Sequence, residues 1–194
     1  YGETVSLEGD GQTKLEMEYV FFGKIADMSE LEKADGCETH EQWELRRFPK
    51  EGQRYNGAIR VRKTSTTTGR GKTDYELTLK TIDSESNVIG KQETEIDVTP
   101  DMFDQFRRLA ANGMIKTRYF FPFQHEDQDL IWEVDVFKGR NGETSEWCKI
   151  DLEVQKPLST IPPFPIQMTD VIDTQPNERT EEQNAFVKRL IEEE

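Results

Sequence analysis

Seven short segments of the chain alternate charged and apolar residues. In residues 15–19, Glu16 and Glu18 occupy every second position, and apolar residues lie between them. Successive side chains of a β-strand point to opposite faces, so the two glutamates share one face and the apolar residues share the other. Each such segment therefore predicts a β-strand with one charged and one apolar face.

The other six segments repeat the pattern with acids and bases mixed. Their charged positions are Arg60 and Arg62, Glu76 and Lys80, Glu93 and Glu95, Lys116 and Arg118, Glu133 and Asp135, and Lys149, Asp151 and Glu153. Ile, Val, Leu, Tyr and Trp fill most of the positions between them, and most of these residue types favour strands. We therefore expect a mainly β fold, within the α+β class because helical segments interrupt the strands.

Three stretches have helical character. Residues 28–48 are polar, and two parts of them, 28–33 and 38–47, have helical tendency. A clearer helix is expected from Thr99 as N-cap, with Pro100 at its first position, to Gly113. A charged helix is expected near the C-terminal end, within 178–194.

Turn-forming residues separate these elements. Residues 65–72 and 139–146 are expected to form hairpin loops, and the proline-rich residues 157–165 an extended connection outside any sheet interior. Residues 1–11 are expected to fray or to form an edge strand. With 194 residues and no internal repeat, the chain is expected to form a single domain over 1–194.

Two packings satisfy the alternation, and they imply different functions. In a sandwich, the apolar faces of two sheets meet in the core and the charged faces lie in water. In a barrel, the charged faces turn inward and helices and loops cover the apolar outside. An interior that mixes carboxylates with arginines and lysines is costly to dehydrate, so it makes sense only around a charged ligand and a metal ion.

Composition narrows the choice of partners. The formal net charge of -14 argues against unassisted binding to DNA, RNA or an acidic membrane surface. No apolar run approaches the roughly 20 residues that span a bilayer. Cys37 and Cys148 are far apart and read as reduced thiols, while His40 and His125 stand in polar stretches and are expected at the surface. We expect a soluble, cytoplasmic protein, monomeric or homodimeric.

The order of the charged pairs resembles the CYTH or triphosphate tunnel metalloenzyme superfamily. The resemblance covers residues 14–155 and follows the sequence of elements along the chain. These are Glu16 and Glu18, Arg60 and Arg62, Lys80, Glu93 and Glu95, Lys116 to Tyr119, Trp132 to Phe137, and Asp151 with Glu153.

The resemblance implies an eight-stranded antiparallel closed β-barrel with helices packed outside, whose tunnel binds a triphosphate group and Mg²⁺ or Mn²⁺. It implies a metal-dependent hydrolase of inorganic tripolyphosphate, nucleoside triphosphates or RNA 5′-triphosphate ends. It assigns catalysis to Glu16, Glu18 and Glu153, and phosphate binding to Arg60, Arg62, Lys80, Lys116 and Arg118. The expected metal ligands are Glu16, Glu18 and Glu153. Two further acids, Asp151 and Asp135, would either bind metal or order the basic side chains. The site would be supported by Glu93, Glu95, Lys14 and Lys149.

One departure from the family pattern concerns the first strand. The family signature there is Glu-x-Glu-x-Lys, and this chain has Val20 in place of the lysine. Lys14, on the same face, is a candidate substitute. Two alternatives to the triphosphatase therefore stay open: a nucleotide cyclase related to this superfamily, and a tunnel that binds a phosphorylated ligand without turnover.

Overall fold

The computed structural model describes residues 12–48, 55–66, 71–83, 91–110, 112–138 and 144–173, with side chains in 17–46, 57–66, 71–81, 92–110, 112–138 and 144–172. These residues form β1 (Gln12–Ile25), η1 (Met28–Lys33, a 3₁₀ helix), β2 (Gly36–Phe48), β3 (Tyr55–Thr66), β4 (Thr73–Asp83), β5 (Lys91–Asp97), α1 (Pro100–Arg108), β6 (Asn112–His125), β7 (Gln128–Lys138), β8 (Thr144–Val154) and β9 (Met168–Asp173). The regions 1–11 and 178–194, for which we predicted a frayed end and a helix, lie outside the described residues, as do parts of the predicted loops 65–72 and 139–146.

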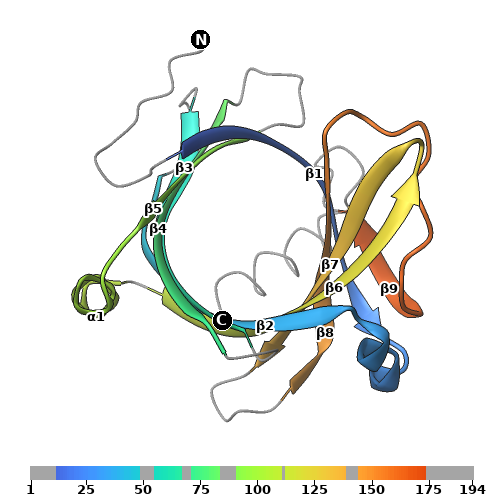
Figure 1. Cartoon of the computed structure of the whole chain (residues 1–194), viewed down its shortest axis with the longest axis horizontal. Helices are drawn as coiled ribbons and strands as arrows, with labels where there is room; N and C mark the ends of the chain where they lie inside the picture. The colour runs from blue at the N-terminus through green and yellow to red at the C-terminus, as the bar shows by residue number, and fades with distance from the viewer. Residues whose placement is uncertain are drawn as a thin grey trace.

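The described strands form one antiparallel sheet in the order β5-β4-β3-β2-β6-β7-β8-β1-β9. Figure 1 shows the strands curving around a central opening, with α1 outside the curve. β1 pairs with β8 through Met17–Lys24, and on its other edge with β5 through Gln12–Glu16 and with β9 near its C-terminal end. The mainly β fold is confirmed, and the described strands do not split into the two stacked sheets of a sandwich.

The prediction of helix within residues 38–47 is wrong, because these residues belong to β2. β2 lies in the middle of the sheet, paired with β3 on one side and β6 on the other. Its Glu, Gln, Leu and Arg residues favour helix locally, but long-range pairing on both edges overrides that preference. The strand β9, which pairs with the end of β1, was not predicted.

The helix α1 begins as predicted and ends earlier. The Thr99 hydroxyl accepts a hydrogen bond from the Met102 N–H at 3.1 Å, and Pro100 occupies the first turn. The helix ends at Arg108 instead of continuing to Gly113, which lies in β6. Phe103 is buried and its ring lies 5.3 Å from that of Tyr75, so α1 covers the convex face of the sheet at β4.

The core lies on the convex face of β1, β7 and β8. It contains the apolar residues that alternate with the charged ones, among them Phe21, Trp132, Val134, Ile150 and Leu152. The connection between β8 and β9 packs over this face, since the Trp132 indole donates to the Pro163 carbonyl at 3.1 Å and Phe164 packs edge-on against Phe21. The prediction that 157–165 form an extended connection outside the sheet is confirmed.

Neither Cys37 nor Cys148 forms a disulfide, as predicted. Within the described residues, no helix has the length and apolar character needed to cross a membrane.

The close approach of β3 to β4 at Gly57 provides a test of this packing. A Cβ atom there would lie 2.2 Å from the Lys80 carbonyl oxygen, which is backbone and cannot move aside without displacing the strand. We expect Gly57→Ala to lower the free energy of unfolding by about 2 kcal/mol, as overpacking typically does. Gly36→Ala is the matched control, since no atom lies within 4 Å of its added methyl group. Urea denaturation measures both, and equal stability of the two variants would contradict this packing.

Candidate functional site

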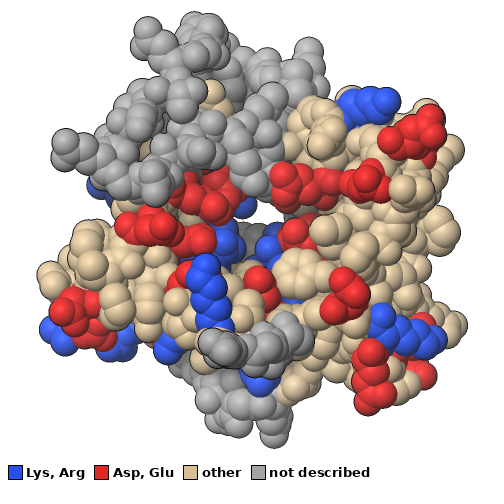
Figure 2. All heavy atoms as spheres, viewed as in Figure 1, with Lys and Arg blue, Asp and Glu red and all other residues tan. Residues whose placement is uncertain are grey.

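A cavity of about 200 Å³ lies on the concave face of the sheet, and every described residue that lines it is charged. Figure 2 shows acidic and basic side chains around the hollow at the centre of the molecule. We call this the charged cavity. Its lining residues are Glu18, Arg60, Arg62, Lys80, Glu93, Glu95, Lys116, Arg118, Glu133, Lys149, Asp151 and Glu153.

The structure brings together most of the site residues that we predicted. Of the described lining residues, only Glu133 was absent from the predicted site, although it belongs to the same alternation as Asp135. Asp135 is fully buried against residues that line the cavity. Glu16 and Lys14 lie in β1, but their side chains are outside the described residues.

Strand register explains why these side chains converge. Residues paired across antiparallel strands point to the same face. The strand β8 lies between β1 and β7, so its Glu153 pairs with Glu18 of β1 and its Asp151 pairs with Glu133 of β7. The basic residues come from β3, β4 and β6 on the other side of the strand order, and Lys149 joins the acids from β8. Four of the six acids thus come from β1, β7 and β8, and five of the six bases from β3, β4 and β6, while Glu93 and Glu95 come from β5, beside β4.

Asp135 is the centre of a buried ion-pair network. Its carboxylate accepts from Lys116 Nζ at 2.7 Å and from Arg118 Nε and Nη2 at 2.7 and 2.9 Å. Burial alone would raise the pKa of Asp135, but Lys116 and Arg118 hold it well below its usual range. Burial lowers the pKa of Lys116 to about 7, and Asp135 opposes that shift. Of the two roles predicted for Asp135, the geometry matches ordering of basic side chains.

Other acids in and beside the charged cavity also face bases. Lys149 lies 3.1 Å from Asp151, Lys80 lies 3.2 Å from Glu93, and Arg118 lies 2.7 Å from Glu133. Arg62 lies 3.0 Å from Glu76 and 3.7 Å from Glu95. Burial, followed by a hydrogen bond with Glu93, raises the pKa of Glu95 to about 7. The acids therefore hold most of the basic side chains in fixed positions.

Arg60 differs from the other arginines of the cavity. Among the side chains that the structure describes, no carboxylate lies within ion-pair distance of it, and its Nε is buried without a hydrogen-bond partner. Burial, and then the charge of Arg62, lowers the pKa of Arg60 to about 10. A guanidinium at pH 7 is still charged, so a positive charge is removed from water here without full compensation.

His40 lies beside the basic residues instead of at the surface, where we expected it. Its side chain is 2% exposed, its Nε2 lies 3.0 Å from Glu38 Oε2, and its Nδ1 is buried without a partner. His40 was not predicted as a site residue, because its segment was expected to be helical. As a strand, β2 places Glu38, His40 and Gln42 on one face by the same alternation that located the other site residues. His125 is partly exposed and contacts the Thr160 carbonyl at 3.0 Å.

The predicted metal ligands lie on β1, β7 and β8. No three His, Cys, Asp or Glu side chains within the described residues come close enough together to hold a metal ion. Glu18 and Glu153 are nevertheless direct cross-strand partners, and Asp151 Oδ1 is buried without a hydrogen bond. Carboxylate oxygens are the ligands that Mg²⁺ and Mn²⁺ prefer, so the chemistry of this donor set fits either ion, with Glu16 as the further ligand predicted from the sequence.

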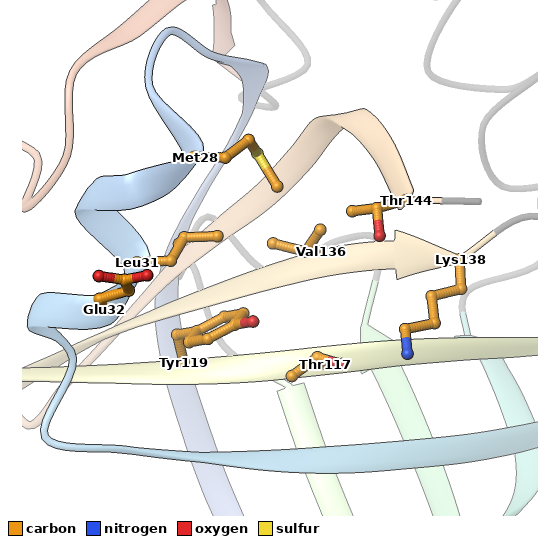
Figure 3. Close-up of a pocket in the computed structure, with 8 residues that line it drawn as sticks. All are labelled: Met28, Leu31, Glu32, Thr117, Tyr119, Val136, Lys138 and Thr144. Atoms are coloured by element: carbon orange, nitrogen blue, oxygen red, sulfur yellow. The ribbon is translucent and has the colours of Figure 1, made fainter. Parts of the chain in front are cut away.

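A second cavity, of about 260 Å³, lies outside the curve of the sheet. Figure 3 shows its walls, which come from η1, β6, β7 and the start of β8. Apolar side chains such as Met28, Leu31 and Val136 line it together with Tyr119 and a few polar groups, including Lys138. It contains none of the predicted site residues, so the charged cavity is the better candidate.

No protein-family model matches the chain, and neither does any curated protein. Among solved structures, the chain is similar to the PH1819 protein from Pyrococcus horikoshii OT3, with 18% sequence identity over 73% of this chain and 80% of that one, and a TM-score of 0.44.

Proposed function

We propose that the protein is a divalent-metal-dependent triphosphatase whose charged cavity is the interior of a closed eight-stranded barrel of the CYTH type. Support for closure comes from β1, which pairs with β8 along one edge and with β5 along the other. β5 is also the first strand of the order β5-β4-β3-β2-β6-β7-β8-β1, so the pairings run through eight strands and return to the start.

The observation that carries the proposal is the set of cations around Arg60. Arg60, Arg62, Lys116 and Arg118 line one small cavity, and Arg60 has no described carboxylate at ion-pair distance. Arginine forks bind two phosphate oxygens at once, and a polyphosphate carries several negative charges along a short chain. A triphosphate would therefore supply the negative charge that no described carboxylate places beside Arg60.

The acidic side of the cavity would complete the chemistry. Glu18 and Glu153, with Glu16, would hold Mg²⁺ or Mn²⁺ opposite the basic residues. When bound, such an ion polarises a phosphoryl oxygen and lowers the pKa of a coordinated water. The arginines and lysines would align the phosphates and neutralise the charge that develops on the phosphoryl oxygens during hydrolysis.

A second candidate, binding without turnover, is favoured by Val20. Register with Asp151 places Val20 on the same face as Glu18, and it packs against the buried pair Phe22 and Ile172. An apolar cluster thus occupies the position where the family pattern has a lysine. Under this alternative, the cavity retains phosphate binding and lacks the group that assists the nucleophile.

Product analysis separates these candidates. Tripolyphosphate, ATP and 5′-triphosphate RNA are each incubated with Mg²⁺ or Mn²⁺, and products are resolved by chromatography. We expect orthophosphate release, and a loss of at least about 100-fold in rate when Glu18 and Glu153 are both changed to glutamine. Glu146→Gln is the matched control on β8, because its side chain is exposed and pairs only loosely with Lys24 at 3.5 Å.

Each other outcome has a distinct meaning. Cyclic AMP with pyrophosphate from ATP would assign the cyclase. Tripolyphosphate that raises the melting temperature without being cleaved would assign the binding protein. Turnover that is unchanged in the Glu18 and Glu153 double variant would place the catalytic acids elsewhere and refute the proposed site.

A further inference from the structure

The hairpin that joins β6 to β7 breaks the alternation of charged and apolar residues. Residues 119–123 are four aromatic residues and a proline. Every second one of them packs against the core on the convex face: Tyr119, Phe121 and Phe123. Phe120 and Pro122 belong to the opposite face, because successive residues of a strand alternate, and neither core cluster of the described residues includes them. The face that lines the charged cavity thus becomes apolar toward the end of β6.

Strand register continues this apolar surface directly from the charged cavity. The pairing of β6 with β7 is continuous, so Arg118, Phe120 and Pro122 follow one another on one face. On β7, Glu133 pairs with Phe120, and Ile131 pairs with Pro122. Arg118 and Glu133 line the cavity and lie 2.7 Å apart. Phe120 is two residues, or about 7 Å, further along the strand than Arg118. We call Phe120, Pro122 and Ile131 the apolar patch.

The apolar patch is accessible to a ligand. Ile131 is 44% exposed, Pro122 is exposed and Phe120 is half-buried. On the other edge of β6, Phe120 pairs with Gly36 of β2, and a Cβ atom added to Gly36 would meet no atom within 4 Å. Open space therefore lies beside Phe120 on the same face. Figure 2 shows uncharged side chains beside charged ones on the rim of the central hollow.

The connection between β8 and β9 holds this hairpin in place. The turn residues Glu126 and Asp127 have φ angles of 49° and 58°, and a two-residue hairpin turn of type I′ requires positive φ at both positions. The Glu126 carboxylate accepts hydrogen bonds from the Ser159 N–H at 2.9 and 3.0 Å and from the Thr160 N–H at 3.3 Å. The apolar patch is thus positioned before a ligand arrives, which lowers the ordering cost of binding.

A nucleobase is the chemical group that matches this surface. Aromatic side chains stack on the faces of all four bases, and an apolar patch beside a phosphate site suits a base that is joined through its ribose to phosphates. A free nucleotide fits better than an RNA chain. The end of the hairpin carries Glu126, Asp127 and Asp129, and these acids would repel the phosphodiesters that follow the first nucleotide of an RNA.

We propose that the apolar patch binds the nucleobase of a free nucleoside triphosphate whose phosphates occupy the charged cavity. Phe120 stacks on the base, and Pro122 and Ile131 extend the apolar contact. The inference rests on the proposed function, because it requires a triphosphate in the charged cavity. It selects nucleoside triphosphates over inorganic tripolyphosphate and RNA 5′ ends as the preferred ligand.

Titration calorimetry with ATP and with tripolyphosphate separates base binding from phosphate binding. Divalent metal is left out so that neither ligand is cleaved. We expect Phe120→Ala to weaken ATP binding about tenfold, as loss of a stacking side chain typically does. Ile131→Thr keeps the β-branch at a partly exposed position, and we expect it to weaken ATP binding about threefold. Both variants should bind tripolyphosphate as the unsubstituted protein does, which also shows that they are folded.

Ile115→Thr is the matched control. Ile115 is 45% exposed, nearly the same as Ile131, and lies on the opposite face of the same strand pair, so its replacement should change neither affinity. Unchanged ATP affinity in both patch variants, or equal losses for ATP and tripolyphosphate, would overturn this inference and leave the proposed function intact. A 5′-triphosphate RNA oligonucleotide that binds more tightly than ATP would overturn the choice of a free nucleotide. If the unsubstituted protein bound neither ATP nor tripolyphosphate, the proposed function would fail as well.

Discussion

Replacing Arg60 with methionine is expected to weaken tripolyphosphate binding about 100-fold without lowering the stability of the protein. A charge-assisted hydrogen-bond pair to phosphate contributes roughly 1.5–3 kcal/mol, which corresponds to a factor of about 10 to 100 or more in affinity. The protein itself should not lose stability, because Arg60 has no described carboxylate to leave unpaired. Methionine has a similar length and no charge, so it removes a desolvated cation and keeps much of the volume.

The opposite directions of the two effects make this variant informative. Titration calorimetry gives the dissociation constant, and urea denaturation gives the free energy of unfolding. Arg108→Met is the matched control: Arg108 lies on α1, is largely exposed and pairs with Asp104, so its loss should leave binding unchanged. Arg60→Lys should fall between wild type and methionine, because it keeps the charge and loses the fork. A large loss of stability in Arg60→Met with unchanged binding would show that Arg60 is structural.

The charged face of the sheet could be predicted because alternation encodes it locally. In a strand, residues two apart share a face whatever the strand pairs with, so Arg60 with Arg62 and Asp151 with Glu153 could be placed together before any topology was known. The same locality explains the success at α1, where the Thr99 cap and Pro100 lie within one turn of each other. Patterns contained within a few residues were therefore predicted correctly.

Features that depend on distant partners could not be predicted. The residues of β2 favour helix on their own, and only their pairing with β3 and β6 makes them a strand, so His40 was misplaced together with its strand. The role of each acid also depends on partners that are distant in the sequence. Asp135 faces Lys116 and Arg118 because β6 and β7 pair in one particular register, and a different register would have freed it for another role.

The buried network around Asp135 gives the largest expected effect on stability. We expect Asp135→Asn to lower the free energy of unfolding by about 3–5 kcal/mol, the usual cost of removing one partner of a buried ion pair. Asp135 is completely buried and bonds to both Lys116 and Arg118, so the substitution leaves two desolvated cations without their shared carboxylate. The new amide group would also present N–H donors to cationic donors.

Removal of one cation should cost less than removal of the shared anion. Lys116→Met leaves the two-pronged contact between Arg118 and Asp135 in place, so Asp135 keeps a partner of opposite charge. We expect this variant to lose about 1–2 kcal/mol, since burial already opposes the charge of Lys116. Asp129→Asn is the control, because Asp129 is exposed on β7 and accepts a hydrogen bond from Gln124; it should change stability by less than about 0.5 kcal/mol. Urea denaturation of the three variants gives the order directly.

If Lys116→Met proved as costly as Asp135→Asn, the carboxylate would not be the shared centre of the network, and the basic residues of the cavity would have to be held in place by other contacts.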